Sequence, residues 1–207
     1  MLNGSSEMVT QISSAVTTYM YNIVMIKFLG EAGVAAITII LYVQFLLVSA
    51  YIGFTSGAAP KISYNYGKKD ESELKKIIKY SFIFICIMSI SSIILSLKFS
   101  PLLVSIFAGK GSELYYITLH GFKIFSISFL ICGINIFAGG MFTAFSNGRI
   151  SALLSLLRTL VFFMVGIIVL PYIFNIDGVW MVVPFAEIMT IIFSAICIYR
   201  YRRVYKY

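Results

Sequence analysis

Long apolar runs alternate with short polar gaps along almost the whole chain. A membrane core about 30 Å thick requires about 20 mainly apolar residues in each helix that crosses it. Glycines in the gaps are typical of turns. Six runs reach the required length, near residues 8–29, 34–57, 77–98, 115–141, 150–174 and 178–199. The pattern therefore predicts an all-α polytopic membrane protein, with six transmembrane helices in a single unit over residues 1–207.

Composition supports this prediction and excludes several classes of protein. Hydrophobic residues make up 60% of the 207 residues and charged residues only 12%, whereas soluble domains carry about 25% charged residues. A cytosolic enzyme, a disordered tail and a disulfide scaffold are therefore not expected. The cysteines lie far apart within apolar runs, so no zinc site or disulfide framework is indicated. No catalytic motif is present, and His120 is the single histidine, so we do not expect an enzyme.

The net charge of +8 is distributed unevenly between the two sides of the predicted membrane unit. Eleven basic residues fall on one side and three, Lys27, Lys98 and Lys110, on the other. The positive-inside rule then places both termini in the cytoplasm of a multi-pass protein of the cell (plasma) membrane. Nucleic acid is not an expected partner, because membrane lipid accounts for this distribution. The eleven residues are Lys61, Lys68, Lys69, Lys75, Lys76, Lys79, Arg149, Arg200, Arg202, Arg203 and Lys206.

The predicted cytoplasmic loop, 58–76, contains turn and helix-start signals. Gly67 suits a left-handed helix end, and Asp70 with Glu73 resembles a capping box that starts the third helix. The order aromatic, Asn, Gly, basic recurs at 145–149, where we interpret it as a helix cap followed by a positive-inside residue. A basic cytoplasmic tail is expected over 200–207.

Polar residues inside the apolar runs are informative because they are costly in hydrocarbon. In the first run, five polar residues are spaced by four or three and therefore share one helical face. Similar faces occur in the fourth to sixth runs, including Asn135 in the fourth. Such faces either pack against other helices, as small residues and the GxxxG-like run Gly53–Gly57 do, or line a wet cavity. We expect the polar faces of the first, second and fourth runs to line a cavity. The five residues of the first run are Glu7, Gln11, Ser14, Thr18 and Asn22.

Arg158 and Glu187 are the most informative charged residues within the runs. The rise of an α-helix places both at similar depths, about 12 and 18 Å from the cytoplasmic side. They are therefore predicted to form an ion pair, either as a structural link or as part of a proton or cation relay through Glu187. Pro184 is expected to kink the last helix beside Glu187. His120 and Lys123 are expected to extend to the membrane interface.

Residues 30–70 resemble part of the multidrug and toxic-compound extrusion (MATE) transporters. The most specific block is Pro60 followed by Ile62-Ser63-Tyr64-Asn65-Tyr66-Gly67; FTAFSNGRISALLSLLR and IDGVWMVVPFAEI support it by their order and spacing. The resemblance covers essentially the whole chain and implies the second six-helix lobe of such a transporter. The family motif residues carried over are Pro60, Tyr64, Asn65, Tyr66 and Gly67.

The resemblance implies a secondary antiporter that exports small organic, cationic or amphipathic compounds against an inward flow of Na⁺ or H⁺, with no other cofactor. Two departures affect the ion site. Ala59 precedes the proline where relatives often have Gln, and the fourth run has Asn135 but no carboxylate. No metal ligand set can be assigned. The candidates for the substrate and cation cavity therefore come from side-chain chemistry: Glu7, Gln11, Thr18, Asn22, Asn135, Arg158 and Glu187.

One lobe alone is not expected to perform alternating access, which requires two bundles around a site. The chain is then a truncated product, a fragment complemented by a separate N-terminal lobe, or half of a homodimer; we expect truncation, because the chain begins abruptly at a helix. A flippase of lipid-linked saccharides and a non-transporting membrane fragment are alternatives. Because Arg158 and Lys123 are the only candidates for cations within the membrane, small organic substrates are favoured over the saccharide lipids.

Overall fold

The computed structural model describes the backbone of residues 2–207 and the side chains of residue 8 and residues 11–207. Throughout this part of the chain the elements are helical, which confirms the all-α prediction. The apolar composition and the absence of long Gly- or Pro-rich segments allow these long helices. The elements are α1 (Leu2–Lys68), α2 (Glu71–Phe107), α3 (Glu113–Phe125), a 3₁₀ turn (Ser126–Ser128), α4 (Phe129–Ala144), α5 (Gly148–Leu156), a π-helix (Leu157–Val161), α6 (Phe162–Trp180) and α7 (Val182–Tyr205).

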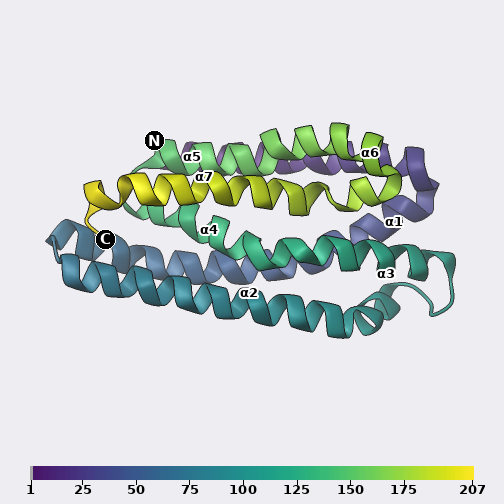
Figure 1. Ribbon diagram of the computed structural model, residues 1–207, viewed down its shortest axis with the longest axis horizontal. Coiled ribbons are helices and arrows are strands. Elements are labelled where there is room, and N and C mark those ends of the chain that lie inside the picture. The colour runs from purple at the N-terminus through teal and green to yellow at the C-terminus, as the bar shows by residue number, and fades with distance from the viewer. Residues whose placement is uncertain (1) are drawn as a thin grey trace.

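Helix α1 contains a reversal at Gly30. This residue has φ 61° and ψ −149°, a region of backbone space that only glycine adopts readily. Figure 1 shows α1 running from the end marked N to the opposite end of the molecule and back. The first two predicted spans are therefore the two halves of α1, which we call α1N (before Gly30) and α1C (after Gly30).

By length and composition, five helices in the described chain are able to cross a membrane. The first candidate, Gln11–Lys68, has 58 residues and includes the reversal at Gly30. The third candidate, Glu113–Ala144, contains the 3₁₀ turn between α3 and α4, and the fourth, Gly148–Trp180, contains the π-helix between α5 and α6. The sequence predicted six spans, whereas five helices are counted here, because α1 is counted once although it holds two of the predicted spans.

The predicted loop 58–76 is much shorter than expected. Helix α1 continues to Lys68 and α2 starts at Glu71, so only Lys69 and Asp70 connect them. Gly67 lies inside the helix, and Lys69, with φ 59°, takes the left-handed position predicted for Gly67. The helix extends because Ile62, 1% exposed, packs in the core beyond the predicted end of the span. The predicted tail 200–207 is likewise helical as far as Tyr205.

Asp70 caps α2 as predicted, and the turn that it closes recurs before α5. The Asp70 main-chain N donates to Asn65 O (3.0 Å), as Asn147 N does to Phe142 O (2.9 Å). Side-chain oxygens of Asp70 and Asn147 accept from the main-chain N of Glu73 (3.1 Å) and Ile150 (3.3 Å). Both turns are Schellman helix ends followed by an N-cap. The recurring sequence at 145–149 is thus a repeated turn of the same geometry.

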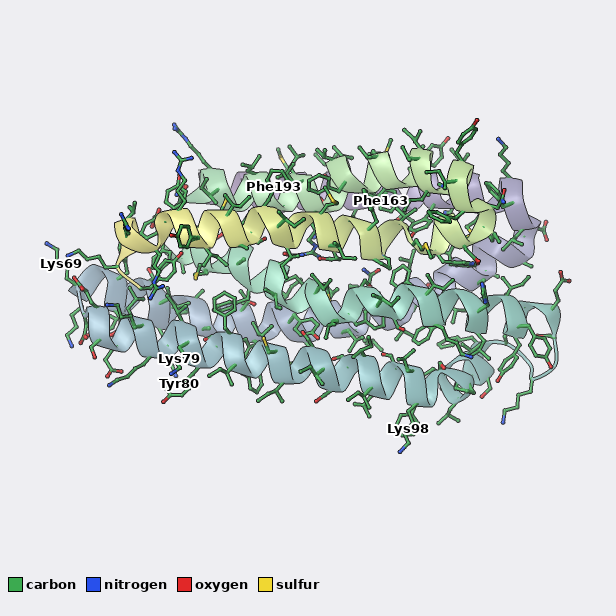
Figure 2. All side chains as sticks on the ribbon, viewed as in Figure 1. Lys69, Lys79, Tyr80, Lys98, Phe163 and Phe193 are labelled. Carbon is green, nitrogen blue, oxygen red and sulfur yellow. The ribbon has the colours of Figure 1, made fainter. Side chains whose placement is uncertain are left out.

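The two turns lie at the same end of the molecule as the start of α1 and the end of α7 (Figure 1). Gly30 and the α2–α3 connection lie at the opposite end (Figure 1). Figure 2 shows Lys69 at the first end and Lys98 toward the other. The structure therefore separates the eleven and three basic residues as the sequence predicted.

Two aromatic-rich clusters form the core, one toward each end. The first includes Ile62, Phe137 and Phe142, and the second includes Phe122 and Trp180. Glycines of α3 and α4 allow large rings to approach: a Cβ at Gly121 would lie 2.5 Å from the Trp180 ring, and one at Gly133 2.5 Å from the Tyr51 ring. The GxxxG-like run behaves differently, because Gly53 and Gly57 face open space in the described structure. Close packing therefore depends on α3 and α4.

Candidate functional site

A buried carboxylate lies between α4 and α7. Glu187, in the second turn of α7, is 2% exposed. The side-chain amide of Asn135 on α4 donates to Glu187 Oε2 (2.7 Å) and to the main-chain oxygen of Glu187 (3.0 Å). Ser194 Oγ in turn donates to Asn135 Oδ1 (3.0 Å), which fixes the orientation of the amide. Asn135 thus uses both ends of its side chain to hold α7 against α4.

The π-helix supplies the countercharge. Arg158 Nε lies 3.1 Å from Glu187 Oε1, and the two side chains are 20% and 3% exposed. This contact confirms the predicted ion pair. Each charge alone would be costly in a low-dielectric interior, and pairing with additional hydrogen bonds offsets that cost. A π-helix widens one turn, is rare, and often marks functional positions; here the arginine is the second of its five residues.

The pair borders a cavity of about 290 Å³ between the two halves of α1 and the α6–α7 side of the bundle. Apolar side chains including Tyr21 and Phe163 form part of the wall. Arg158 and Glu187 are the only charged side chains in this lining, so the described wall carries one charge of each sign. The polar lining residues are Ser14, Thr17, Thr18, Gln44, Arg158, Thr159 and Glu187.

The structure brings together only part of the predicted cavity set. Thr18, Arg158 and Glu187 line the cavity, and Asn135 lies behind its wall, bonded to Glu187. Gln11 is exposed and Asn22 half-buried, and neither lines the cavity. The side chain of Glu7 lies outside the described residues. The helical face of the first run is thus divided, because the cavity spans only part of its length.

The walls come only in part from the helices that we expected. The predicted first and second runs, which are α1N and α1C, do line the cavity, but the fourth run does not, and the π-helix, α6 and α7 supply the remaining lining residues. Gln44 of α1C was missed, although a single glutamine within the apolar run LYVQFLL was an available signal. Helix α4 serves instead as the support behind Glu187.

The structure also locates the predicted proline kink and the two basic residues that were expected at the membrane interface. Pro184 lies in the first turn of α7, where a missing N–H costs no hydrogen bond, so the predicted kink is wrong. Lys123 is exposed. His120 is also exposed, and its Nε2 lies 2.6 Å from Asp177 Oδ1.

The family motif residues lie at the end of α1, away from the cavity. Pro60, Tyr64 and Gly67 are exposed. The Asn65 side chain donates to Lys61 O (2.8 Å). The Tyr66 ring packs edge-on against Phe145 (5.1 Å between centroids) and Tyr205 (5.5 Å). This block therefore builds the turn between α1 and α2 and its aromatic contacts. Among the described residues, no group of three or more His, Cys, Asp or Glu side chains comes together as a metal site.

The five long apolar helices of the described chain are those of a multi-pass membrane protein. The MatE family model matches residues 8–168, most of the chain. This chain therefore belongs to the MatE family. No curated protein sequence matches it significantly.

Solved structures of MATE transporters share the fold. A MATE in complex with MaL6 has a TM-score of 0.89 at 18% identity, covering 99% of this chain and 46% of that chain. A MOP superfamily transporter from Pyrococcus furiosus, described as having a binding pocket of reverse polarity, also has a TM-score of 0.89, at 17% identity, covering 99% of this chain and 46% of that one. The Vibrio cholerae MATE transporter VcmN in the bent form has 0.88 at 17% identity, covering 99% and 46%. The chain thus spans about half the length of the structures that it matches.

Proposed function

We propose that this chain forms one lobe of a secondary transporter in the plasma membrane, which exports small organic, cationic or amphipathic compounds in exchange for Na⁺ or H⁺. Membership of the MatE family and the shared fold support transport. The observation that carries the proposal is the buried Arg158–Glu187–Asn135 network beside a cavity. Ionisable groups buried in membrane helices are costly, and they commonly mark ion or substrate paths.

In this proposal, Glu187 is the group that responds to the coupling ion. Binding of a proton to its carboxylate removes the negative charge that holds Arg158, so the guanidinium becomes free to reorient within the cavity wall. A bound Na⁺ has the same effect by competing with Arg158 for the carboxylate. Because the ion pair lies in the wall, a change in its geometry alters the shape and charge of the space offered to a substrate.

A second bundle completes the site. Alternating access moves two bundles about a central site, and this chain matches 46% of the length of the MATE in complex with MaL6. The partner is an N-terminal lobe or a second copy of this chain. The polar residues Ser14, Thr18 and Gln44 of α1 then form one wall of a cleft whose opposite wall the partner provides.

Accumulation of a cationic dye in a pump-deficient bacterium tests the proposal. The chain is expressed alone and fused to the N-terminal lobe of a MATE transporter, with the membrane content of each protein measured. We expect at least one form to lower dye accumulation, and collapse of the ion gradients to abolish the effect. Unchanged accumulation in both forms, at normal membrane content, would contradict the proposal.

Glu187→Gln tests the role of the network in the active form. We expect loss of gradient-dependent export. The amide of glutamine neither binds a proton near neutral pH nor carries the negative charge for which Arg158 and a cation compete. Glu31→Gln is the matched control, since it makes the same change at an exposed carboxylate that follows Gly30 and does not line the cavity. Normal export by Glu187→Gln would remove this residue from the coupling mechanism.

A further inference from the structure

A basic hollow separate from the cavity lies where the end of α7 meets the start of α2. It has a volume of about 760 Å³. We call it the basic pocket, and its lining residues are Glu71, Lys75, Tyr199, Arg200, Arg202, Arg203, Lys206 and Tyr207. It lies at the end of the molecule that carries most of the basic residues (Figure 1).

The positive charge of the basic pocket is largely unbalanced. It has five cationic side chains and one acidic side chain, Glu71, whose Oε1 accepts from Lys206 Nζ at 2.8 Å. Arg202 Nε donates to the main-chain oxygen of Tyr207 (3.1 Å), which orients that guanidinium. Among the described residues, Lys75, Arg200 and Arg203 have no ion-pair partner. Three or more donors therefore remain for an anion.

The helix dipole and the positive-inside rule explain why cations gather at this end of α7. They do not explain why cations of two helices face one hollow. Lys75 comes from the second turn of α2, more than a hundred residues before Arg200 in the chain, and the Lys206–Glu71 pair joins the two helices across the hollow. The basic pocket is thus a concave arrangement of donors.

An apolar stripe leads from the basic pocket along α7 toward the middle of the molecule. Ile188, Ile192, Ile196 and Tyr199 are spaced by four, four and three residues and thus share a helical face. They are 43%, 49%, 56% and 78% exposed. A free phosphate ion gains nothing from this stripe, whereas the acyl chains of a lipid bury it. The aromatic ring of Tyr199 at the junction suits the headgroup level of a membrane.

We propose that the basic pocket binds the phosphate headgroup of an anionic phospholipid, whose acyl chains lie along the Ile188–Ile196 face of α7. Arg200, Arg203 and Lys75 supply charge-assisted hydrogen bonds to the phosphate oxygens, and basic pockets between helices on the cytoplasmic side recognise such headgroups. The inference concerns a site outside the cavity and does not depend on the transported compound.

Native mass spectrometry of the full chain in detergent tests this site. Phosphatidylglycerol and phosphatidylcholine are titrated separately, with inorganic phosphate as a third arm. We expect phosphatidylglycerol to bind more tightly than phosphatidylcholine, and inorganic phosphate at the same concentration not to displace it. Equal affinity for the two lipids, or displacement by inorganic phosphate, would overturn the proposal.

Paired double variants separate the basic pocket from general surface charge. Lys75→Gln/Arg203→Gln removes one lysine and one arginine from the basic pocket, whereas Lys79→Gln/Arg149→Gln removes the same two charges from exposed positions outside it. We expect the first variant to lose about thirtyfold in phosphatidylglycerol affinity, since each of the two basic residues near a membrane surface contributes about 1 kcal/mol. The second variant should retain the phosphatidylglycerol affinity of the unmodified chain. An equal loss in both variants, with normal elution in size-exclusion chromatography, would assign the binding to diffuse charge and overturn the proposal.

Discussion

The carboxylate of Glu187 is held by Arg158 on one oxygen and by Asn135 on the other. For individual residues, the sequence predicted the ion pair, because two opposite charges at similar depth in adjacent apolar helices have few other partners. It was uninformative about Asn135, since a spacing pattern places an amide on a face without identifying the residue that it contacts. Only the packing of α4 against α7 determines that contact.

Removal of the guanidinium should leave this carboxylate buried with one partner fewer. We expect Arg158→Met to lower the free energy of unfolding by about 3–5 kcal/mol, the usual cost of an uncompensated buried charge. Chemical denaturation in detergent measures the loss. Arg158→Met/Glu187→Met should recover most of it, because the apolar pair leaves no lone charge. Additive losses in the double variant would show that the two charges do not stabilise each other.

The Tyr51 ring fills the space beside Gly133. A Cβ at this glycine would lie 2.5 Å from Tyr51 Cε1, and the ring is fixed by its hydroxyl, which bonds Ser89 Oγ and Ser92 Oγ (3.3 Å each). We expect Gly133→Ala to destabilise the protein by about 1–3 kcal/mol, as overpacking of a core does. Gly53→Ala, where a Cβ meets open space, is the control and should show no loss of thermal stability. Equal melting temperatures for the two variants would contradict this account.

The apolar runs predicted the helices, but they did not predict how consecutive helices are connected. Lengths of about 20 apolar residues set the predicted spans. The first two spans lie in α1 and the third in α2, whereas each of the last three crosses from one helical element of the structure into another. The extension of α1 to Lys68 was missed because polar residues such as Ser63 and Asn65 continue a helix at a membrane surface as readily as they form a loop. The π-helix at Leu157–Val161 leaves no signal in a pattern of apolar residues, because one wider turn does not change which residues are apolar.

The two repeated turns differ in one respect, the charge of the capping residue. The hydrogen bond from Glu73 N lowers the pKa of Asp70 below its usual 3.8, with a smaller contribution from Lys68. Because the folded pKa lies below the unfolded one, the cap contributes fully above pH 3.8 and is lost as the pH falls through the folded value. Asn147 does not titrate in this range.

We therefore expect acid to open the start of α2 before the start of α5. Amide exchange at Glu73, relative to that at Ile150, should accelerate as the pH falls below 3.8. The Asp70→Asn variant should abolish this pH dependence, because its cap is as insensitive to protons as that of Asn147. A ratio that stays constant with pH in the unmodified protein would show that Asp70 does not act as the cap in solution.

At the scale of the whole molecule, charge and topology agree. The turn at Ser146, the start of α1 and the end of α7 share one end, and Gly109 lies in the connection at the other (Figure 1). The positive-inside rule predicts that the first end is cytoplasmic. The separation of the basic residues between the two ends was predictable from the loops alone, whereas the composition of the cavity was not, since it depends on how the helices pack.

Cysteine labelling in intact cells checks this orientation. In a chain whose three native cysteines are replaced, Gly109→Cys should react with a membrane-impermeant maleimide, and Ser146→Cys should react only after the cells are opened. Both positions are exposed, so access depends on the side of the membrane. Labelling of Ser146→Cys in intact cells, with Gly109→Cys protected, would invert the proposed topology.

The position of Asn135 has an evolutionary consequence. Asparagine and aspartate have nearly the same shape, and a single base change in the codon converts one into the other. An aspartate here would place a second carboxyl group where the amide now lies, 2.7 Å from Glu187 Oε2. Two carboxylates at such a distance do not both ionise and instead share a proton. A lineage carrying this lobe is thus one mutation away from placing a proton-sharing pair of carboxyl groups beside Arg158.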